Sequence, residues 1–216
     1  PMLHNVFLME IYPYKFQPQT ILLLKMIQEG AIGEVSQIYA DFGFTVDDAE
    51  NNIRLKPELG GGVMWDAGAY PVSMIRAITG EKANEIMAFG KLNDQQLDIS
   101  VSAMLRFKSK ITAQLNCNFS AAPHRYVRVI GSKGIITCGY NNVTKPNTAF
   151  IEVKKGLDWN YELEKIEVDF GSGFRFEAEA FADHIKNYNK KEQILMMNES
   201  VDNISTILDI LKIIKK

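Results

Sequence analysis

The chain has 216 residues, of which 46% are hydrophobic and 23% charged, a composition typical of a globular protein long enough to bury one core. Its formal net charge of -2 gives no general attraction to nucleic acid, which argues against that class of partner. No run of residues approaches the roughly 18 apolar positions of a membrane span. The first residues also lack the charged and apolar regions of a signal peptide. We therefore expect a single cytoplasmic domain over residues 1–216, without a membrane partner.

The first third of the chain alternates predicted strands and helices. A short, continuous apolar run at residues 6–11 predicts a strand, and because no partner strand precedes it, we expect the chain to begin inside a larger protein. Residues 17–29 carry apolar side chains at helical spacing and are followed by a glycine, which predicts a helix. Partial alternation of apolar and polar residues over 34–46 predicts a half-buried strand. Residues 63–78, closed by Gly80, are predicted to form a second helix.

The middle of the chain predicts a sheet, and its end predicts two helices. The expected strands lie at residues 86–92, 99–107, 111–119, 125–130, 134–138, 150–153 and 165–170. Short turns join several of them, which favours antiparallel pairing because parallel neighbours need a crossover of about a dozen residues. Helices are expected at 174–188 and 199–214, with Asn198 and Ser200 as candidate caps of the second. The predicted fold class is α+β, a large and mainly antiparallel open sheet with helices packed on one face.

The cysteines and histidines show no spacing typical of a metal site. Cys117 and Cys138 each stand alone in apolar or glycine-flanked stretches, which predicts buried free thiols. His184 lies on the apolar face of a predicted helix, which favours a packing role. No metal is expected.

Three consecutive glycines at 60–62 directly precede the second predicted helix. Glycine adopts backbone angles that other residues avoid and allows a ligand or another backbone to approach closely. Asp66 falls in the first turn of the helix and Tyr70 lies four residues on, so both are expected on one face. The pattern predicts a carboxylate and a phenol beside a glycine-rich opening. Taken alone, the spacing favours a structural role, in which the glycines turn the chain, Asp66 caps the helix and Tyr70 packs.

Four stretches of the chain resemble segments of the Gfo/Idh/MocA oxidoreductases. Residues 52–72 resemble the family's "N-I-R-x-x-P-x-L-G-G-G-x-x-x-D-x-G-x-Y-P-V", and residues 9–19 resemble "M-E-A-F-M-Y-R-F-H-P-Q". Residues 129–134 are similar to "I-x-G-T-x-G", and residues 176–182 are similar to "Y-x-x-E-x-x-x-F". The four matches occur in the family's order and cover nearly the whole chain. The resemblance therefore favours the functional interpretation of the glycine run.

The resemblance implies a two-domain enzyme with an N-terminal Rossmann domain that binds NAD or NADP. The present chain corresponds to the C-terminal α+β domain, whose open sheet commonly mediates homodimers. In this family an acid–base side chain at the position of Tyr70 serves hydride transfer, and the residue at Asp66 orients substrate hydroxyls or a lysine. That lysine belongs to an "E-K-P" motif of the Rossmann domain and is absent from this sequence. A phenol acts as a base near neutral pH only where a cation stabilises the phenolate.

Further site residues follow from the same resemblance or from their position. The candidates for substrate binding are Arg54, Tyr14, Lys15, Gly61, Gly62 and His124, and Glu10 is the candidate for cofactor binding. Linker packing is the alternative for Glu10, Tyr14 and Lys15, and a surface salt bridge is the alternative for Arg54. His124 and Arg125 follow Pro123 at the start of a predicted strand, where either side chain could contact substrate.

A dinucleotide site needs a glycine-rich turn between a strand and a helix within a βαβ unit. The nearest candidate is residues 171–176, where Phe176 replaces the third glycine and a helix, not a strand, comes next. We therefore expect no cofactor on the isolated chain, which we expect to be inactive alone. The predicted function is that of the substrate domain of an NAD(P)-dependent dehydrogenase acting on a sugar, polyol or diol. The alternative is a non-catalytic binding or dimerisation module that retains the fold.

Overall fold

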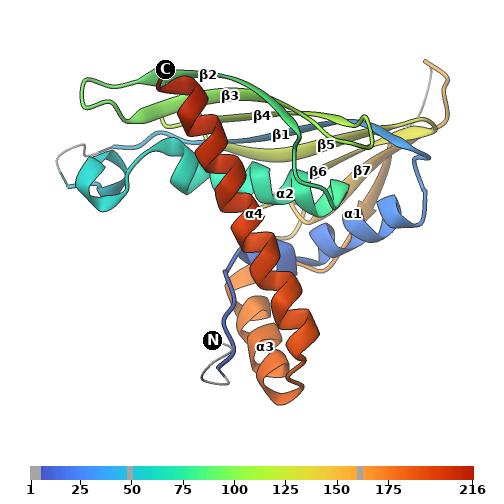
Figure 1. Cartoon of the computed structure of the whole chain (residues 1–216). Coiled ribbons are helices and arrows are strands. Elements are labelled where there is room, and N and C mark those ends of the chain that lie inside the picture. Colours follow the sequence, from blue (N-terminus) through green and yellow to red (C-terminus); the bar gives the residue numbers. More distant parts are fainter. Residues whose placement is uncertain (1–5, 48–50, 160–162) are drawn as a thin grey trace.

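The computed structural model describes residues 6–47, 51–159 and 163–216, and it contains one large sheet with the helices on one side (Figure 1). The strands are β1 (Val35–Gly43), β2 (Glu85–Leu92), β3 (Asp98–Arg106), β4 (Thr112–Asn118), β5 (His124–Gly131), β6 (Gly134–Gly139), β7 (Phe150–Lys155) and β8 (Glu164–Glu167). The longer helices are α1 (Pro18–Gln28), α2 (Ala69–Thr79), α3 (Gly173–Lys186) and α4 (Lys190–Ile214). Short helical turns are η1 (Pro13–Phe16), η2 (Ile53–Leu55), η3 (Pro57–Leu59) and the π-helix η4 (Met64–Gly68). The predicted α+β class is confirmed.

The sheet has the strand order β2-β3-β4-β1-β5-β6-β7-β8. Neighbouring strands are antiparallel except β1 and β4, which run parallel with Ala40 opposite Leu115. The exception arises because β1 inserts between two strands that follow one another in the sequence, β4 and β5. The insertion places the C-terminal end of β1 beside the N-terminal end of β5.

The two faces of the sheet differ in exposure. On β3 and β4, alternate residues such as Ala103, Leu105 and Leu115 are buried against the helical layer. The opposite face exposes Met87 and Met104, which lie opposite each other on β2 and β3. The period-two pattern that predicted half-buried strands therefore separates a packed face from an open one.

Helix α4 crosses the helical side of the sheet, and its N-terminal half extends away from the sheet beside α3 (Figure 1). The chain end of α4 packs against β2, where a Cβ at Gly90 would lie 2.9 Å from Ile214. In the described ranges, no helix combines the length and the apolar run needed to cross a membrane.

The strand predicted at residues 6–11 is wrong. These residues form no strand pairing, and the backbone of Leu8 is instead bonded to the side chain of Gln193 on α4. The Leu8 N–H donates to Gln193 Oε1 at 3.2 Å, and Gln193 Nε2 donates to the Leu8 carbonyl at 2.6 Å. A side-chain amide thus supplies the hydrogen-bond partners that a neighbouring strand would otherwise provide.

The predicted start of the last helix is also wrong. Helix α4 begins at Lys190, and Asn198 and Ser200 lie inside it. Asn189 is the cap, because its side-chain oxygen accepts the N–H of Lys191 at 3.0 Å and satisfies one of the free donors at the helix start.

The expected roles of the cysteines and of His184 are confirmed. Cys117 and Cys138 are free and buried, and burial raises the pKa of the Cys138 thiol to about 12, so it carries little reactive thiolate. The ring of His184 stacks on Phe7 with centroids 5.3 Å apart. His184 therefore packs against the N-terminal segment.

Candidate active site

The glycine run forms a turn whose backbone packs directly against the backbone of residues 54–56. Gly60 has a φ of 76° and ends η3. The N–H groups of Gly61 and Gly62 donate to the carbonyls of Lys56 and Arg54, each at 2.9 Å. A Cβ at Gly61 would lie 2.7 Å from the Arg54 carbonyl oxygen. Gly61 and Gly62, predicted to contact substrate, are therefore occupied by the turn itself, and neither lines the cavity described below.

A buried carboxylate fixes the helix that follows the turn. Asp98, which is 1% exposed at the start of β3, accepts the Met64 N–H at 2.7 Å. Burial raises the pKa of Asp98, and bonds from backbone N–H groups oppose that change. Gly62 is required here, because a Cβ at this position would lie 2.4 Å from Asp98 Oδ1 and its φ is 119°. The free N–H at the helix start thus serves the fold rather than a ligand.

The first turn after the glycines is a π-helix, η4, which continues directly into α2. The widened turn carries Asp66, and α2 carries Tyr70. Both side chains line one cavity, as their spacing predicted.

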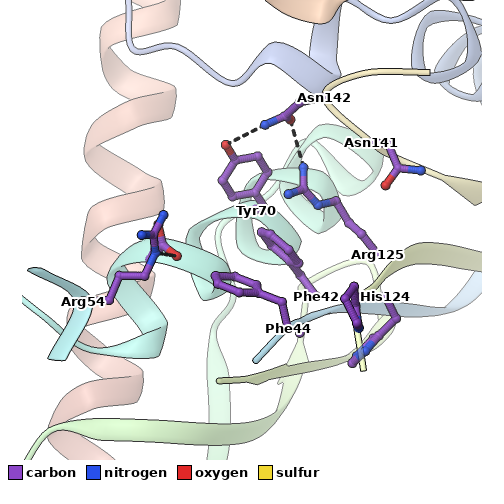
Figure 2. Close-up of a pocket in the computed structure, with 11 residues that line it drawn as sticks. Phe42, Phe44, Arg54, Tyr70, His124, Arg125, Asn141 and Asn142 are labelled. Carbon is purple, nitrogen blue, oxygen red and sulfur yellow. Dashed lines mark hydrogen bonds and ion pairs between the residues drawn. The ribbon is translucent and has the colours of Figure 1, made fainter. Parts of the chain in front are cut away.

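That cavity has a volume of about 540 Å³ and lies where β1 ends and β5 begins (Figure 2). The antiparallel register brings its walls together, because Phe42 pairs with Arg125 and Gly43 pairs with His124. We call it the polar cavity, since its lining includes the hydrogen-bonding side chains of Arg54, Asp66, Tyr70, His124, Arg125, Asn141 and Asn142.

Arg54 and Asp66 form an ion pair inside the polar cavity. Arg54 Nε lies 2.7 Å from Asp66 Oδ2, and the Arg54 guanidinium lies over the ring of Phe44 at 5.6 Å. Both partners are partly exposed, with 39% and 34% of their side-chain surface accessible. The pair holds the Asp66 carboxylate in one orientation beside Tyr70. Of the two predicted roles of Arg54, the salt bridge is present, and it lies within the cavity.

Tyr70 is half-buried among other aromatic rings. Its ring centroid lies 5.5 Å from that of Tyr12, 5.7 Å from that of Tyr14 and 5.3 Å from that of Phe42. Its hydroxyl oxygen accepts a hydrogen bond from Asn142 Nδ2 at 3.3 Å. The phenol is therefore held in place by packing and presents its oxygen at the cavity wall.

A second cavity of about 380 Å³ lies on another side of Tyr70 and Asp66, which line it as well. We call it the N-terminal cavity. Its other lining residues are Glu10, Ile11, Tyr12, Trp65, Ala69, Ile204 and Ile207. Glu10, predicted to face the cofactor, is exposed here and accepts a hydrogen bond from the Tyr12 hydroxyl at 3.2 Å.

Two predicted substrate contacts lie outside the polar cavity. Tyr14 is fully buried, and its hydroxyl donates to Ser73 Oγ at 2.9 Å. Burial raises the pKa of Tyr14 well above its usual value, so the phenol remains protonated. Lys15 forms an ion pair with Glu199 on α4. Tyr14 packs its ring against Tyr70, and Lys15 lies over the ring of Tyr12. His124 does line the cavity, with Nδ1 2.7 Å from the Ala122 carbonyl oxygen.

Several cavity residues were not among the sequence-derived candidates. Phe42 and Phe44 come from the end of β1, and Asn141 and Asn142 follow β6. Arg125, expected with His124 as a possible substrate contact, also lines the cavity. No local motif marks these residues, because they meet only through the pairing of β1 with β5 and of β5 with β6.

The glycine turn at residues 171–173 is not open to the phosphates of a dinucleotide. The Gly171 N–H donates to Thr144 Oγ1 at 3.0 Å, and the Gly173 N–H donates to the Asn142 carbonyl at 2.7 Å. A Cβ at Gly173 would lie 2.3 Å from the Pro13 carbonyl oxygen. The amides of this turn are thus used within the protein, and the space beside them is filled.

Comparison with known proteins adds independent information. A sequence profile described as the GFO/IDH/MocA C-terminal domain matches residues 21–137. A trans-1,2-dihydrobenzene-1,2-diol dehydrogenase from Xenopus laevis is 30% identical over 210 residues, which is 95% of this chain and 62% of the relative. A D-xylose 1-dehydrogenase (NADP(+)) from Haloferax volcanii is 29% identical over 178 residues, 82% of this chain and 54% of the relative. The chain therefore spans less than two thirds of the length of these relatives.

A similar fold is found in the crystal structure of an aldose-aldose oxidoreductase from Caulobacter crescentus complexed with glycerol. The two structures superpose with a TM-score of 0.82 at 22% sequence identity, over 98% of this chain and 63% of the other. At this level of identity, the similarity establishes a shared fold.

Proposed function

The chain belongs to the GFO/IDH/MocA family, and on this premise we propose that it is the substrate-binding and acid–base domain of an NAD(P)-dependent oxidoreductase acting on a sugar, polyol or diol. One observation carries the proposal: Tyr70 and Asp66 lie side by side at the meeting point of two cavities. Relatives named as a diol dehydrogenase and a xylose dehydrogenase support the substrate class.

The polar cavity suits a ligand rich in hydroxyl groups. Arg54 and Arg125 offer donors, Asp66 offers an acceptor, and Asn141 and Asn142 offer both. A volume of about 540 Å³ is within the range of small-molecule sites. Rings such as Phe42 would cover the apolar face of a sugar or diol.

Oxidation of an alcohol removes a proton from the hydroxyl group and a hydride from the carbon. We assign the proton to the Tyr70 oxygen, which would accept it during oxidation and return it during reduction. Asp66, held by Arg54, would accept a hydrogen bond from a neighbouring substrate hydroxyl and so orient the reacting carbon. NAD or NADP would supply the hydride acceptor or donor.

The cofactor would be held mainly by a dinucleotide-binding domain, with Glu10 and the N-terminal cavity facing it. The turn at residues 171–173 supports this, because its Gly171 and Gly173 N–H groups are bonded within the protein. Titration of the isolated chain with NADH and NADPH, followed by nucleotide fluorescence, should give no saturable binding in the micromolar range. Micromolar affinity would contradict this part of the proposal.

We further propose a homodimer formed through the open face of the sheet. That face exposes Phe89 to 78% beside Met87 and Met104 on β2 and β3, and a cluster of exposed apolar side chains is typical of an interface. Phe89→Glu should convert the dimer to a monomer in sedimentation velocity. The matched charge change Lys25→Glu, at an exposed position of α1 on the helical side of the sheet, should leave the dimer intact.

The proposed activity is tested with the complete reading frame that contains this chain. Sugars, polyols and diols are screened for reduction of NAD or NADP by nucleotide absorbance, with Tyr70→Phe as the matched variant. We expect turnover of at least one compound and its loss in the variant. Saturable sugar binding without turnover of any compound would favour the non-catalytic module instead.

A further inference from the structure

Arg125 is held against the proposed acid–base residue by two aromatic rings. Its guanidinium carbon lies 3.6 Å from the ring centroid of Phe42 and 4.5 Å from that of Tyr70. The strand register fixes the first contact, because Phe42 on β1 pairs directly with Arg125 on β5. The second contact depends on where α2 places Tyr70. A guanidinium over the face of an aromatic ring is an attractive arrangement, and the attraction grows as water is removed.

An amide bridge connects the same guanidinium to the phenol oxygen. Arg125 Nη1 donates to Asn142 Oδ1 at 2.9 Å, and Asn142 Nδ2 donates to the Tyr70 hydroxyl oxygen at 3.3 Å (Figure 2). Arg125 therefore reaches Tyr70 both through the ring and through a side chain that contacts the reacting oxygen.

Arg125 differs from the other arginine of the polar cavity in having no anionic partner. Arg54 is paired with Asp66, whereas no carboxylate in the described part of the chain lies within ion-pair distance of Arg125. A partly buried guanidinium without a counter-charge is unfavourable. An anion that forms next to it is stabilised to a corresponding degree.

We propose that Arg125 is a positioning residue that stabilises the phenolate form of Tyr70, so that this domain supplies the acid–base group with a cation of its own. The inference rests on the proposed function of Tyr70. The proton of the Tyr70 hydroxyl leaves to solvent when the phenolate forms, and the phenolate then accepts the substrate's hydroxyl proton. The family resemblance implied only a lysine outside this chain, so Arg125 is an additional source of positive charge.

Other charged and titratable groups near Tyr70 do not replace Arg125. Burial raises the pKa values of Tyr12, Tyr14 and Tyr140, so these neighbouring phenols stay neutral. The remaining groups that face this region are Asp66 on η4, Arg54 on η2, His124 on β5, Lys15 after Tyr14, Glu10 in the N-terminal segment and Glu199 on α4. Two ion pairs neutralise four of them, Arg54 with Asp66 and Lys15 with Glu199.

The test uses the chain itself and needs neither substrate nor cofactor. Phenolate formation is followed by ultraviolet difference absorbance during a pH titration. The titration curve of the same chain carrying Tyr70→Phe is subtracted, and the rise in absorbance that remains is called the Tyr70 step. Arg125→Gln should move the Tyr70 step to higher pH by about one unit, because a nearby cation favours the charged form. Arg125→Lys should restore most of the shift, since it keeps the charge.

Arg128→Gln is the matched control, because Arg128 lies on the same strand but is exposed on the opposite face of the sheet. It should leave the Tyr70 step unchanged. An unchanged Tyr70 step in a folded Arg125→Gln chain, verified by circular dichroism, would overturn the inference. If Arg125→Gln does not fold, Arg125→Met takes its place: it keeps an unbranched side chain between the rings of Phe42 and Tyr70, removes the charge and should also move the step to higher pH, and an unchanged step would count against the inference.

Kinetics of the complete enzyme separate this inference from the proposed function. In the oxidation direction, the rise of kcat/KM with pH should move upward in Arg125→Gln by the same amount as the Tyr70 step. A higher KM for an anionic substrate, with the Tyr70 step unmoved, would make Arg125 a substrate-anion site and overturn the inference. If Tyr70→Phe abolishes turnover but the Tyr70 step lies at the same pH in Arg125→Gln as in the unchanged chain, the proposed function is supported and the role of Arg125 is contradicted.

Discussion

The two cavities beside Tyr70 share a wall but differ in chemistry. Tyr70 and Asp66 line both. The polar cavity adds arginine, histidine and asparagine side chains, whereas the N-terminal cavity adds mainly apolar ones such as Ile204 and Ile207. One side therefore offers hydrogen bonds to a hydroxylated ligand, and the other offers an apolar surface to a flat or hydrophobic one. The difference is consistent with the proposed function, in which substrate and cofactor reach Tyr70 from different sides.

After the loss of the Tyr70 hydroxyl, the largest loss of activity is expected from substitution of Asp66, which lines both cavities. Asp66→Asn weakens an acceptor for a substrate hydroxyl and breaks the ion pair with Arg54. Because a hydrogen bond to a charged group contributes about 1.5–3 kcal/mol, kcat/KM for the polyol should fall by about 10- to 100-fold. Steady-state kinetics of the complete enzyme measure this.

Glu58→Gln is the control for that substitution. Glu58 is an exposed acid on η3, before the glycine run, and it lines neither cavity. It should leave kcat/KM unchanged. Equal losses in the two variants would show that the effect of Asp66 is general electrostatics and not contact with the substrate.

Both cavities depend on the helix start that Asp98 holds. Asp98→Ala removes the acceptor of the Met64 N–H and leaves that donor buried without a partner, which should lower the free energy of unfolding by about 2 kcal/mol. Urea denaturation measures the change. A loss below about 0.5 kcal/mol would contradict the role given to Asp98.

The pH dependence of that effect has a definite sign. Because burial raises the pKa of Asp98 above its value in the unfolded chain, the folded state favours the protonated acid. Its contribution to stability is present below the unfolded pKa and is lost as pH rises through the folded one. Relative to Asp98→Asn, which cannot titrate, the unchanged chain should therefore gain stability as the pH is lowered. A relative loss on acidification would contradict this sign.

The smallest effect is expected from a substitution in the N-terminal cavity, on the KM for the cofactor. Ile204→Ser removes an aliphatic contact from the N-terminal cavity, which should raise the KM for the nicotinamide cofactor by about tenfold, because burial of such a side chain contributes about 1.5–3 kcal/mol. The KM for the polyol should stay the same. Leu195→Ser, an exposed position on the same helix outside this cavity, is the control. An increase confined to the polyol KM would reverse the assignment of the two cavities.

The parts of the site that local sequence predicted differ from the parts that it did not. Asp66 and Tyr70 follow a glycine run at helical spacing, so their placement on one cavity could be predicted from neighbours in the chain. Phe42 and Asn142 reach the same cavity only because β5 pairs with β1 on one side and with β6 on the other. Pairing between strands that are far apart in the chain cannot be predicted from a short stretch of sequence, so the residues that it brings together cannot be predicted either.

The fold shows the same division. The strands and the α+β class followed from alternation and turns, whereas the apolar run at residues 6–11 was mistaken for a strand because its hydrogen-bond partner, Gln193, lies 185 residues away. The glycines were expected beside a ligand, but Gly61 and Gly62 are required by close contacts with Arg54 and Asp98. Glycine allows close approach, and the sequence does not say what approaches.

The central claim, that Tyr70 transfers the proton at the junction of the two cavities, is tested most directly by measuring polyol binding and turnover on one preparation of the complete Tyr70→Phe enzyme. The loss of a general acid–base group should lower kcat by about 10²- to 10⁴-fold, while the Kd for the polyol stays within about threefold of the unchanged enzyme. A Tyr70→Phe enzyme that keeps its kcat, or that loses polyol affinity in place of turnover, would contradict the claim.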